Sequence, residues 1–422
     1  MAVRFEGLAS IVRNATYLSV GHVISVVVRV IYVLTLVRWL SPDDYGKLSY
    51  GMAWYLTFIV FTYLGQDIVL SRGIGRGIQN IDTLMNKTLL HRVMAIGVVG
   101  VVSIAVATVF EPDARTLTIL SVFAGAMAGR SLWIWSAWVL TALEKTKHAV
   151  TIDLIFRPIE VLCVLAFVAV HEPSILGIAA IHSASWCVQG LVGAFRARKA
   201  MVRPIRVGID DSVSLFRDGA AGAVYAFGLA WFLQAPVLLF RHFGESGPAL
   251  GHFALAFQLI GHLLVIPYFL GAAALPILSR SAMRKDGKDR ILALAILAGV
   301  PVAGGVFVAL AAALGPPAVT LLFGPAYAFT ADVLVAALWL LIPLGIAVLL
   351  HQFTFAASQR TFLGVVAPLA GAIVMTLSYA PMTANQGYKG AILATGVGMT
   401  AWAFLVLASL LRIGFFKRRS VA

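Results

Sequence analysis

Apolar stretches of membrane-spanning length follow one another along almost the whole of this chain. A helix needs about 20 residues to cross the hydrocarbon core of a bilayer, and about twelve such stretches can be placed here. The longest polar gaps, around 71–92 and 196–217, are far shorter than the roughly 50 residues of the smallest soluble domains. The sequence therefore predicts an all-α polytopic membrane protein without a separate catalytic or nucleic-acid-binding domain.

Composition supports helices that face lipid. The chain is 60% hydrophobic and 12% charged, whereas a soluble protein averages about 25% charged residues. Only helices and closed barrels satisfy their backbone groups in lipid, and a barrel would show short alternating segments. We expect helices at roughly 15–40, 48–70, 93–110, 116–140, 148–170, 176–195, 218–240, 250–278, 291–314, 329–350, 361–379 and 389–411.

The basic residues predict the orientation. Of the 32 Lys and Arg residues, 24 lie in the termini and alternate loops on one side of the predicted spans, 5 lie on the other side and 3 lie within spans. The positive-inside rule places the richer side in the cytoplasm. We therefore expect a multi-pass protein of the cytoplasmic (inner) membrane with both termini in the cytoplasm.

Enzymatic and metal-binding signatures are absent from the sequence. Its two cysteines, Cys163 and Cys187, fall in predicted spans and form neither a disulfide framework nor a metal site. No GxxxxGK[ST], HExxH or CxxC motif occurs. We predict that the chain is not an enzyme, and that it uses no cofactor other than a coupling proton or monovalent cation.

The chain resembles itself across its two halves. The segment 38–53 is similar to 241–256, and 176–185 is similar to 389–398, with a Gly/Pro turn and a glycine that opens the next span. Gly46 and Gly251 lie 205 residues apart, and Gly177 and Gly390 lie 213 apart. Six spans in each half give a parallel repeat. We expect an N-terminal bundle at 1–200, a cytoplasmic linker at 201–216 and a C-terminal bundle at 217–422.

Four phrases carry a resemblance to a known family. They are VRWLSPDDYG at 37–46, AALPILSR at 273–280, LLFGPAYAFTADVL at 321–334 and GYKGAILAT at 387–395. Together, in this order, they resemble the polysaccharide-biosynthesis and O-antigen flippases of the multidrug/oligosaccharidyl-lipid/polysaccharide exporter superfamily. Val37 and Ser41 depart from the Ala and Gly that are commoner in the first phrase.

The resemblance implies a MATE-like fold, with two six-helix bundles in a V around a central cavity. It implies a flippase that carries a polyprenyl-pyrophosphate-linked oligosaccharide across the membrane by alternating access, for surface or exo-polysaccharide synthesis. The expected partners are that lipid-linked cargo, membrane lipid and polysaccharide polymerase machinery, with no nucleic acid. We expect a monomer.

Arg29 is the first candidate for binding the cargo. A charge in mid-span costs about 2.5–3.5 kcal/mol on the insertion scale, so it persists where it meets water, a partner or charged cargo. His22, Ser25, Arg29 and Tyr32 follow at steps of three and four on one helix face. The planar guanidinium suits a pyrophosphate, and the alternative is a pair with a carboxylate of a neighbouring helix. Arg130 and Asp67 are further cavity candidates, although Asp67 is also well placed for the membrane interface.

A second charged group lies in the fifth predicted span. Asp153, Arg157 and Glu160 are spaced four and three apart and share one helix face. One interpretation is a self-neutralising ionic cluster. The other is a proton or cation site that drives transport, because intramembrane carboxylates often mark such relays.

Two other functions remain open from the sequence. A cation-coupled multidrug exporter of the same fold would carry cationic cargo and favour an acidic cavity. The mid-span charges Arg29, Arg130 and Arg157 outnumber Asp153 and Glu160 by one. A membrane-embedded polysaccharide polymerase would need a long external loop, and the longest expected one, 315–328, is short and mostly apolar.

Overall fold

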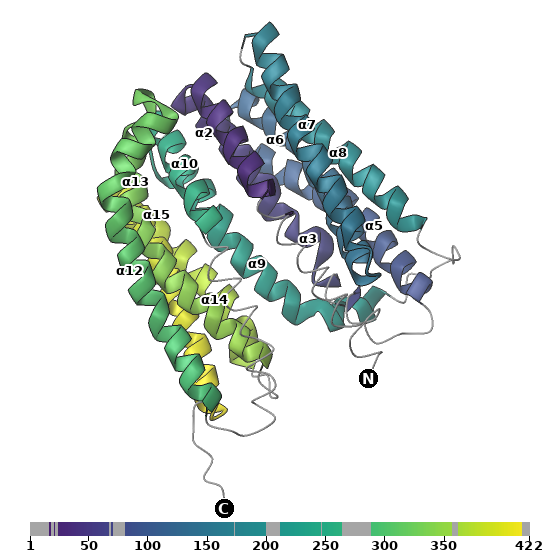
Figure 1. Ribbon diagram of the computed structural model, residues 1–422, viewed down its shortest axis with the longest axis vertical. Helices are drawn as coiled ribbons and strands as arrows, with labels where there is room; N and C mark the ends of the chain where they lie inside the picture. Colours follow the sequence, from purple (N-terminus) through teal and green to yellow (C-terminus); the bar gives the residue numbers. More distant parts are fainter. Residues whose placement is uncertain are drawn as a thin grey trace, which may run out of the picture. The chain divides into compact units, whose positions relative to one another are not determined.

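The computed structural model describes residues 17, 21, 24–66, 69–70, 81–172, 174–199, 212–245, 247–263, 288–356 and 362–415. Helices account for nearly all of this described chain, which contains no strand (Figure 1). The expected all-α class is thereby confirmed.

The helices follow the predicted spans in order. Residues 24–39 are helical. The elements that follow are α2 (Pro42–Phe58), α3 (Val60–Tyr63), α5 (Ile81–Phe110), α6 (Ala114–Ala142), α7 (Thr146–Val170), α8 (Ile175–Arg198), α9 (Ser212–Phe243), α10 (Pro248–Leu263), α12 (Lys288–Phe323), the 3₁₀ helix η2 (Pro325–Tyr327), α13 (Phe329–Ala337), the 3₁₀ helix η3 (Leu338–Leu340), α14 (Leu341–Ala356) and α15 (Phe362–Arg412). The end of the eighth predicted span, with the phrase at 273–280, lies outside the described residues.

Within the described chain, seven helical segments are long and apolar enough to cross a bilayer: Asp82–Phe110, Ala114–Ala142, Ile175–Arg198, Gly219–Phe243, Leu297–Phe323, Phe329–Thr354 and Phe362–Arg412. The segment Phe329–Thr354 runs through α13, η3 and α14. The last segment, Phe362–Arg412, is 51 residues long, which is far more than one span at 1.5 Å per residue. Its backbone leaves the helical region at Gly387, with φ 56° and ψ −135°, so the two spans predicted at 361–379 and 389–411 form one element with a break. The chain is a multi-pass membrane protein.

Two predicted loops are helical instead. The expected basic loop around 71–92 ends early, because α5 begins at Ile81. Arg92 is fully buried, with its guanidinium carbon 5.4 Å from the centre of the Tyr63 ring, so it does not belong to a polar loop. The expected external loop at 315–328 is mostly helix, since α12 continues to Phe323 and ends at Gly324, whose φ is 88°. A positive φ suits glycine and stops the helix there.

Packing divides the chain into two compact units. Unit 1 comprises Met1–Leu40 and Gly51–Ala226, and unit 2 comprises Ser41–Tyr50 and Phe227–Ala422. The start of α2 thus packs with unit 2, and α9 is shared between the units. These units are defined by which residues pack together, whereas the expected bundles at 1–200 and 217–422 are defined by a boundary in the sequence, so the bundles stay a prediction. Most of the linker expected between them lies outside the described residues.

Glycine contacts bring the helices of unit 1 close together. A Cβ added to Gly129 of α6 would lie 2.3 Å from the backbone nitrogen of Cys187 in α8. One added to Gly190 of α8 would lie 2.2 Å from the carbonyl oxygen of Gly129. Small residues of this kind let transmembrane helices approach backbone to backbone. One face of α8 is therefore fixed against α6, which leaves another face for α7.

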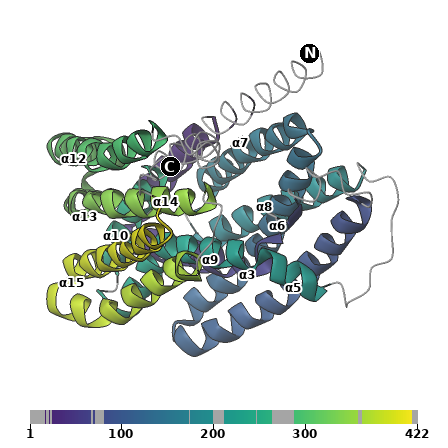
Figure 2. The ribbon, with the colours of Figure 1, turned by 90° about the horizontal axis from the view of Figure 1, so that it is seen from below.

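Unit 2 uses the same device. A Cβ on Gly371 would lie 2.7 Å from the carbonyl oxygen of Gly398, and both glycines belong to α15 on either side of its break. Figure 2 shows α15 folded back on itself at that break and α14 beside it. Two glycines that the repeat relates also contact each other in unit 2. A Cβ added to Gly46 of α2 would lie 2.8 Å from the backbone nitrogen of Gly251 in α10.

Candidate functional site

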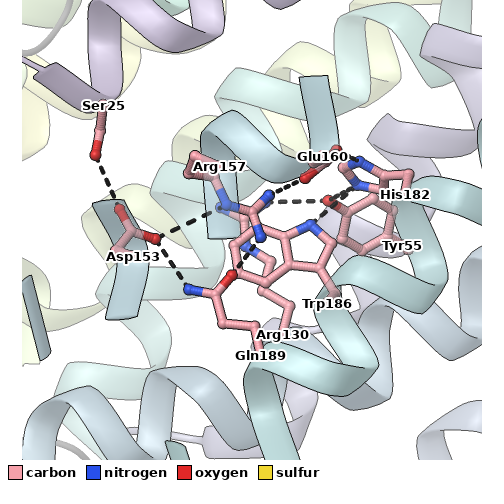
Figure 3. A network of polar contacts seen from close by, with 9 residues as sticks. All are labelled: Ser25, Tyr55, Arg130, Asp153, Arg157, Glu160, His182, Trp186 and Gln189. Atoms are coloured by element: carbon pink, nitrogen blue, oxygen red, sulfur yellow. Dashed lines mark hydrogen bonds and ion pairs between the residues drawn. The ribbon is translucent and has the colours of Figure 1, made fainter. Parts of the chain in front are cut away.

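Two polar stripes face each other across α7 and α8. Asp153, Arg157 and Glu160 of α7 are spaced four and three apart, and His182, Trp186 and Gln189 of α8 have the same spacing. The stripes pair in opposite order, so that Asp153 meets Gln189, Arg157 meets Trp186 and Glu160 meets His182 (Figure 3). Each stripe follows one helix face. The two consecutive antiparallel helices therefore contact each other through six polar or aromatic side chains.

Arg157 lies at the centre and is buried. Its guanidinium donates to Glu160 and to the side-chain oxygen of Gln189. Its Nε lies 3.9 Å from Oδ1 of Asp153, and its Cζ lies 3.8 Å from the centre of the Trp186 ring. A buried guanidinium needs partners for both its charge and its N–H groups. Glu160, Asp153 and the Trp186 ring balance the charge, and Glu160 and Gln189 accept from Nη1 and Nη2, whereas Nε has no hydrogen-bond partner among the described residues.

Asp153 ties the first described helix to this group. The hydroxyl of Ser25 donates to Oδ2 of Asp153 at 2.9 Å, and the amide of Gln189 donates to Oδ1 at 3.0 Å. Ser25, predicted from its face on the first span, therefore contacts the carboxylate predicted from α7. The charged stripe is thus anchored to helical residues 24–39.

Glu160 and His182 form the other end of the group. Nδ1 of His182 lies 2.6 Å from Oε1 of Glu160. Nε2 of the same ring lies 3.0 Å from the hydroxyl of Tyr55 and 3.1 Å from Nε1 of Trp186. Arg130 of α6 extends the chain of contacts by donating from Nη1 to the Tyr55 hydroxyl at 3.1 Å. All of these side chains except Arg130 are buried.

Arg29 differs from Arg157 in its surroundings. Its side chain is exposed, yet Arg130, Asp153, Arg157 and Tyr55 all lie within electrostatic range of it. It makes no hydrogen bond or ion pair to any other residue in the described part of the chain. Ser25 and Tyr32, four residues before and three after it, point into the polar group: Ser25 bonds Asp153, and the Tyr32 ring centroid lies 6.4 Å from that of His182. Arg29 therefore lies on the side of its helix that faces these charges.

The charges of this group are unevenly compensated. The Glu160 carboxylate accepts hydrogen bonds from Arg157 and His182, whereas the Asp153 carboxylate accepts them from the neutral donors Ser25 and Gln189. Arg130 donates to a neutral hydroxyl, with the Trp186 ring centre 4.8 Å from its Cζ. Among the described residues, neither Arg29 nor Arg130 forms an ion pair. Two guanidiniums thus keep donors that an anion would accept from.

The structure brings most of the predicted site residues together. Seven of the nine lie in this one group: Ser25, Arg29, Tyr32, Arg130, Asp153, Arg157 and Glu160. His22 and Asp67 lie outside the described residues. The roles of all nine in binding or coupling stay a prediction. No cluster of three metal-binding side chains occurs in the described ranges.

Sequence reasoning missed Tyr55, His182, Trp186 and Gln189. The last three repeat the spacing of Asp153, Arg157 and Glu160 inside an apolar span, and this second polar stripe was a usable signal. Tyr55 gave none, because a tyrosine among apolar residues is ordinarily a packing residue.

Comparison with known proteins supports the family and the fold. The family of polysaccharide biosynthesis proteins matches residues 11–282. An inward-facing multidrug resistance MATE family transporter of the MOP superfamily superposes with a TM-score of 0.71 and 13% identity, over 97% of this chain and 100% of its own. No individually curated protein sequence matches the chain.

Two further solved structures have the same fold. The lipid II flippase MurJ, in an inward closed conformation, gives a TM-score of 0.68 with 13% identity, over 95% of this chain and 87% of its own. A MOP superfamily transporter from Pyrococcus furiosus, reported with a reverse polarity of its binding pocket, gives 0.64 with 14% identity, over 96% of each chain. At these identities the likeness shows a MATE-like fold.

Proposed function

The chain belongs to the family of polysaccharide biosynthesis proteins, and from that premise we propose that it is a flippase for a polyprenyl-pyrophosphate-linked oligosaccharide. It would move the charged headgroup across the cytoplasmic membrane by alternating access, for surface or exo-polysaccharide synthesis, with both termini in the cytoplasm. The family and the fold shared with a lipid II flippase support a flippase or transporter of the MOP superfamily. The cargo itself is the further step.

The observation that carries this step is the state of Arg29. The side chain is exposed, no carboxylate pairs with it in the described chain, and it shares its surroundings with Arg130. The alternative raised by the sequence, a dry pair with a neighbouring carboxylate, describes Arg157 instead. A pyrophosphate offers several anionic oxygens to guanidinium donors and would be held by charge-assisted hydrogen bonds.

The net charge of the group favours an anionic cargo over a cationic drug. Arg29, Arg130 and Arg157 exceed Asp153 and Glu160 by one positive charge. Glu160 is already paired with Arg157, and Asp153 has the Arg157 guanidinium 3.9 Å away, so each carboxylate lies beside a positive charge. A cationic compound placed beside Arg29 would meet a like charge that no carboxylate pairs with among the described residues, which opposes binding.

An export assay with Arg29 variants tests the proposal. Hydrogen bonds to a charged group contribute about 1.5–3 kcal/mol, and about 1.4 kcal/mol corresponds to a factor of ten. Arg29→Ala should reduce polymer export about 10–100-fold at native expression, and Arg29→Lys should keep part of it. Arg115→Ala, which removes an exposed arginine at the start of α6, is the matched control and should export normally.

Two results would contradict the proposal. Normal export from Arg29→Ala would remove the role of this residue in holding the cargo. Unchanged export from a deletion strain that becomes sensitive to cationic drugs would favour the multidrug exporter.

A further inference from the structure

The polar group of α7 and α8 contains one side chain whose proton count changes easily near neutral pH. Arginine stays protonated in proteins and glutamine does not titrate. Histidine has an ordinary pKa close to 6.5, so small changes around it move its charge. His182 is buried between three elements and lies at the junction of the contacts that lead from Glu160 to Arg130.

The donors around His182 determine where its proton lies. The indole nitrogen of Trp186 only donates, so Nε2 of His182, 3.1 Å away, must accept. The ring proton is then on Nδ1, where it is donated to the Glu160 carboxylate at 2.6 Å. With Nε2 as the acceptor from Trp186, His182 carries a single ring proton and is neutral.

A second proton would have to bind at Nε2, and it would change the contacts there. The new N–H would face the Trp186 N–H, and that pair would separate because neither group accepts. Tyr55 would accept from Nε2 as well as from Arg130. The Trp186 ring lies against both Arg157 and Arg130. A displacement of this ring would therefore move Arg130, which we place with Arg29 in the headgroup site.

The groups that face His182 set the sign of the effect. They are Glu160 and Arg157 of α7, Tyr55 of α2, Tyr32 of the first described helix, and Arg130 of α6 through Tyr55. With a neutral ring, the group formed by Arg29, Arg130, Arg157, Asp153 and Glu160 carries one net positive charge. Protonation of His182 adds a second one.

A metal cation fits this group poorly. Oδ1 and Oδ2 of Asp153 accept from Gln189 and Ser25, and both oxygens of Glu160 accept from His182 and Arg157. A sodium ion would have to displace these donors and would lie beside the Arg157 guanidinium. A proton at a nitrogen needs neither change.

We propose that Nε2 of His182 is a proton-binding site whose occupancy is linked to anion binding at Arg29 and Arg130. This inference rests on the proposed function and names the ion that acts with that site. At an effective dielectric constant of about 20, any positive charge roughly 10 Å from a bound anion tightens its binding about tenfold or more. By reciprocity, the bound anion raises the proton affinity of His182 by the same factor.

Nitrogen NMR of the full-length protein with ¹⁵N-labelled histidine tests the site, with inorganic pyrophosphate as the probe. The His182 signal is identified as the one missing from His182→Gln, and His148→Gln, an exposed position at the start of α7, is the control for the substitution. The expected signal is that of a neutral ring protonated at Nδ1. Its titration midpoint should rise by about one pH unit when pyrophosphate is bound, since tenfold is one unit.

A second variant keeps the test usable if His182→Gln does not fold. Trp186→Phe removes the donor to Nε2 and keeps an aromatic ring, so the titration midpoint of His182 should rise even without pyrophosphate. A wild-type ring protonated at Nε2 when neutral, or a midpoint unmoved by Trp186→Phe, would overturn the proton site.

The remaining outcomes separate this inference from the proposed function. Pyrophosphate that binds the wild type by calorimetry without moving the midpoint overturns the linkage alone. Pyrophosphate binding that requires sodium, tested by replacing sodium with choline, also overturns the inference. A wild type that fails to bind pyrophosphate overturns the anion site, and the linkage with it.

Discussion

The last two helices of each half hold together in different ways. In unit 1, α7 and α8 meet through Asp153, Arg157, Glu160 and their partners. In unit 2, the two parts of α15 meet through glycine contacts such as Gly371 with Gly398. Among the residues of unit 2 whose burial the structure describes, no Asp, Glu, Lys or Arg is buried.

Repeat-related positions show where the difference arises. At the offset of Gly177 and Gly390, the residues that correspond to His182, Trp186 and Gln189 are Thr395, Met399 and Trp402. The Thr395 hydroxyl donates to the backbone of its own helix, and Trp402 stacks on Phe232 with 5.5 Å between ring centroids. Close glycine contacts occur in both halves, although at positions that this offset does not relate, whereas the charged stripe belongs to one half. Packing and cargo chemistry are therefore carried by different residues.

The glycine contacts should give the largest effect, and it should be similar in both units. Valine at Gly129 would meet the backbone of α8, and valine at Gly398 would lie 2.5 Å from Cβ of Met375. Overpacking costs about 1–3 kcal/mol and more where the backbone must move, so we expect each variant to lose at least about 3 kcal/mol of unfolding free energy. SDS titration of the purified protein measures this.

Gly97→Val is the control for that pair, because nothing lies within 4 Å of a Cβ at Gly97. Glycine is about 1 kcal/mol less favourable in a helix than alanine and valine is at most about 0.7 kcal/mol less favourable, so the control should leave stability unchanged or raise it by a few tenths of a kcal/mol. The account of the packing fails if Gly129→Val is as stable as this control.

Breaking the buried ion pair should affect unit 1 strongly. Glu160→Gln leaves the Arg157 guanidinium without its closest anion, and removal of one partner of a buried pair costs about 3–5 kcal/mol. The double variant Arg157→Gln/Glu160→Gln should recover part of this loss. Thr395→Val, at the position in unit 2 that corresponds to His182, should cost under about 1 kcal/mol because its hydroxyl bonds only its own helix. Equal losses in the two units would erase the proposed contrast.

Asp153→Asn should be milder than Glu160→Gln. The two direct hydrogen bonds to Asp153 come from neutral donors, and Arg157 lies 3.9 Å away. An asparagine keeps one oxygen acceptor, so the expected loss is about 1 kcal/mol. The same SDS titration ranks the two carboxylates, and a larger loss for Asp153→Asn would show that Arg157 depends chiefly on Asp153.

The smallest effect is expected for an ion pair at the surface. Nζ of Lys47 lies 2.8 Å from Oδ2 of Asp43 in the first turns of α2, and both side chains are partly accessible. Exposed pairs of this kind contribute about 0–1 kcal/mol. Lys47→Ala should lower the denaturation midpoint slightly and only at low salt. A loss as large as that of Glu160→Gln would mean that burial does not decide the strength of ion pairs in this protein.

Much of the architecture followed from the sequence because the bilayer allows few solutions. Apolar runs of spanning length must be helices, and the predicted spans match the described helices. The ends of α5 and α12 were wrong for a specific reason. A buried Arg92 was taken for a loop residue, and Pro316 and Pro317 were taken for a loop although the helix continues to Phe323.

The site followed from the sequence only in part. Helical spacing places Ser25, Arg29 and Tyr32 on one face and Asp153, Arg157 and Glu160 on another, and the structure brings the two faces together. Spacing within one helix does not reveal which distant helix lies opposite. Tyr55 therefore became visible only when α2, α6, α7 and α8 were placed together, and the stripe of α8, which its spacing could have revealed, gained its partners only there.

The central claim is that Arg29 meets the pyrophosphate of a lipid-linked cargo. The most direct measurement is the transbilayer movement of a fluorescent polyprenyl-pyrophosphate sugar in proteoliposomes, read by the fraction that dithionite added outside can quench. Wild-type protein should move the probe, and folded Arg29→Ala protein should move it about tenfold more slowly or worse. Equal rates for the two proteins, each faster than empty liposomes, would contradict the account.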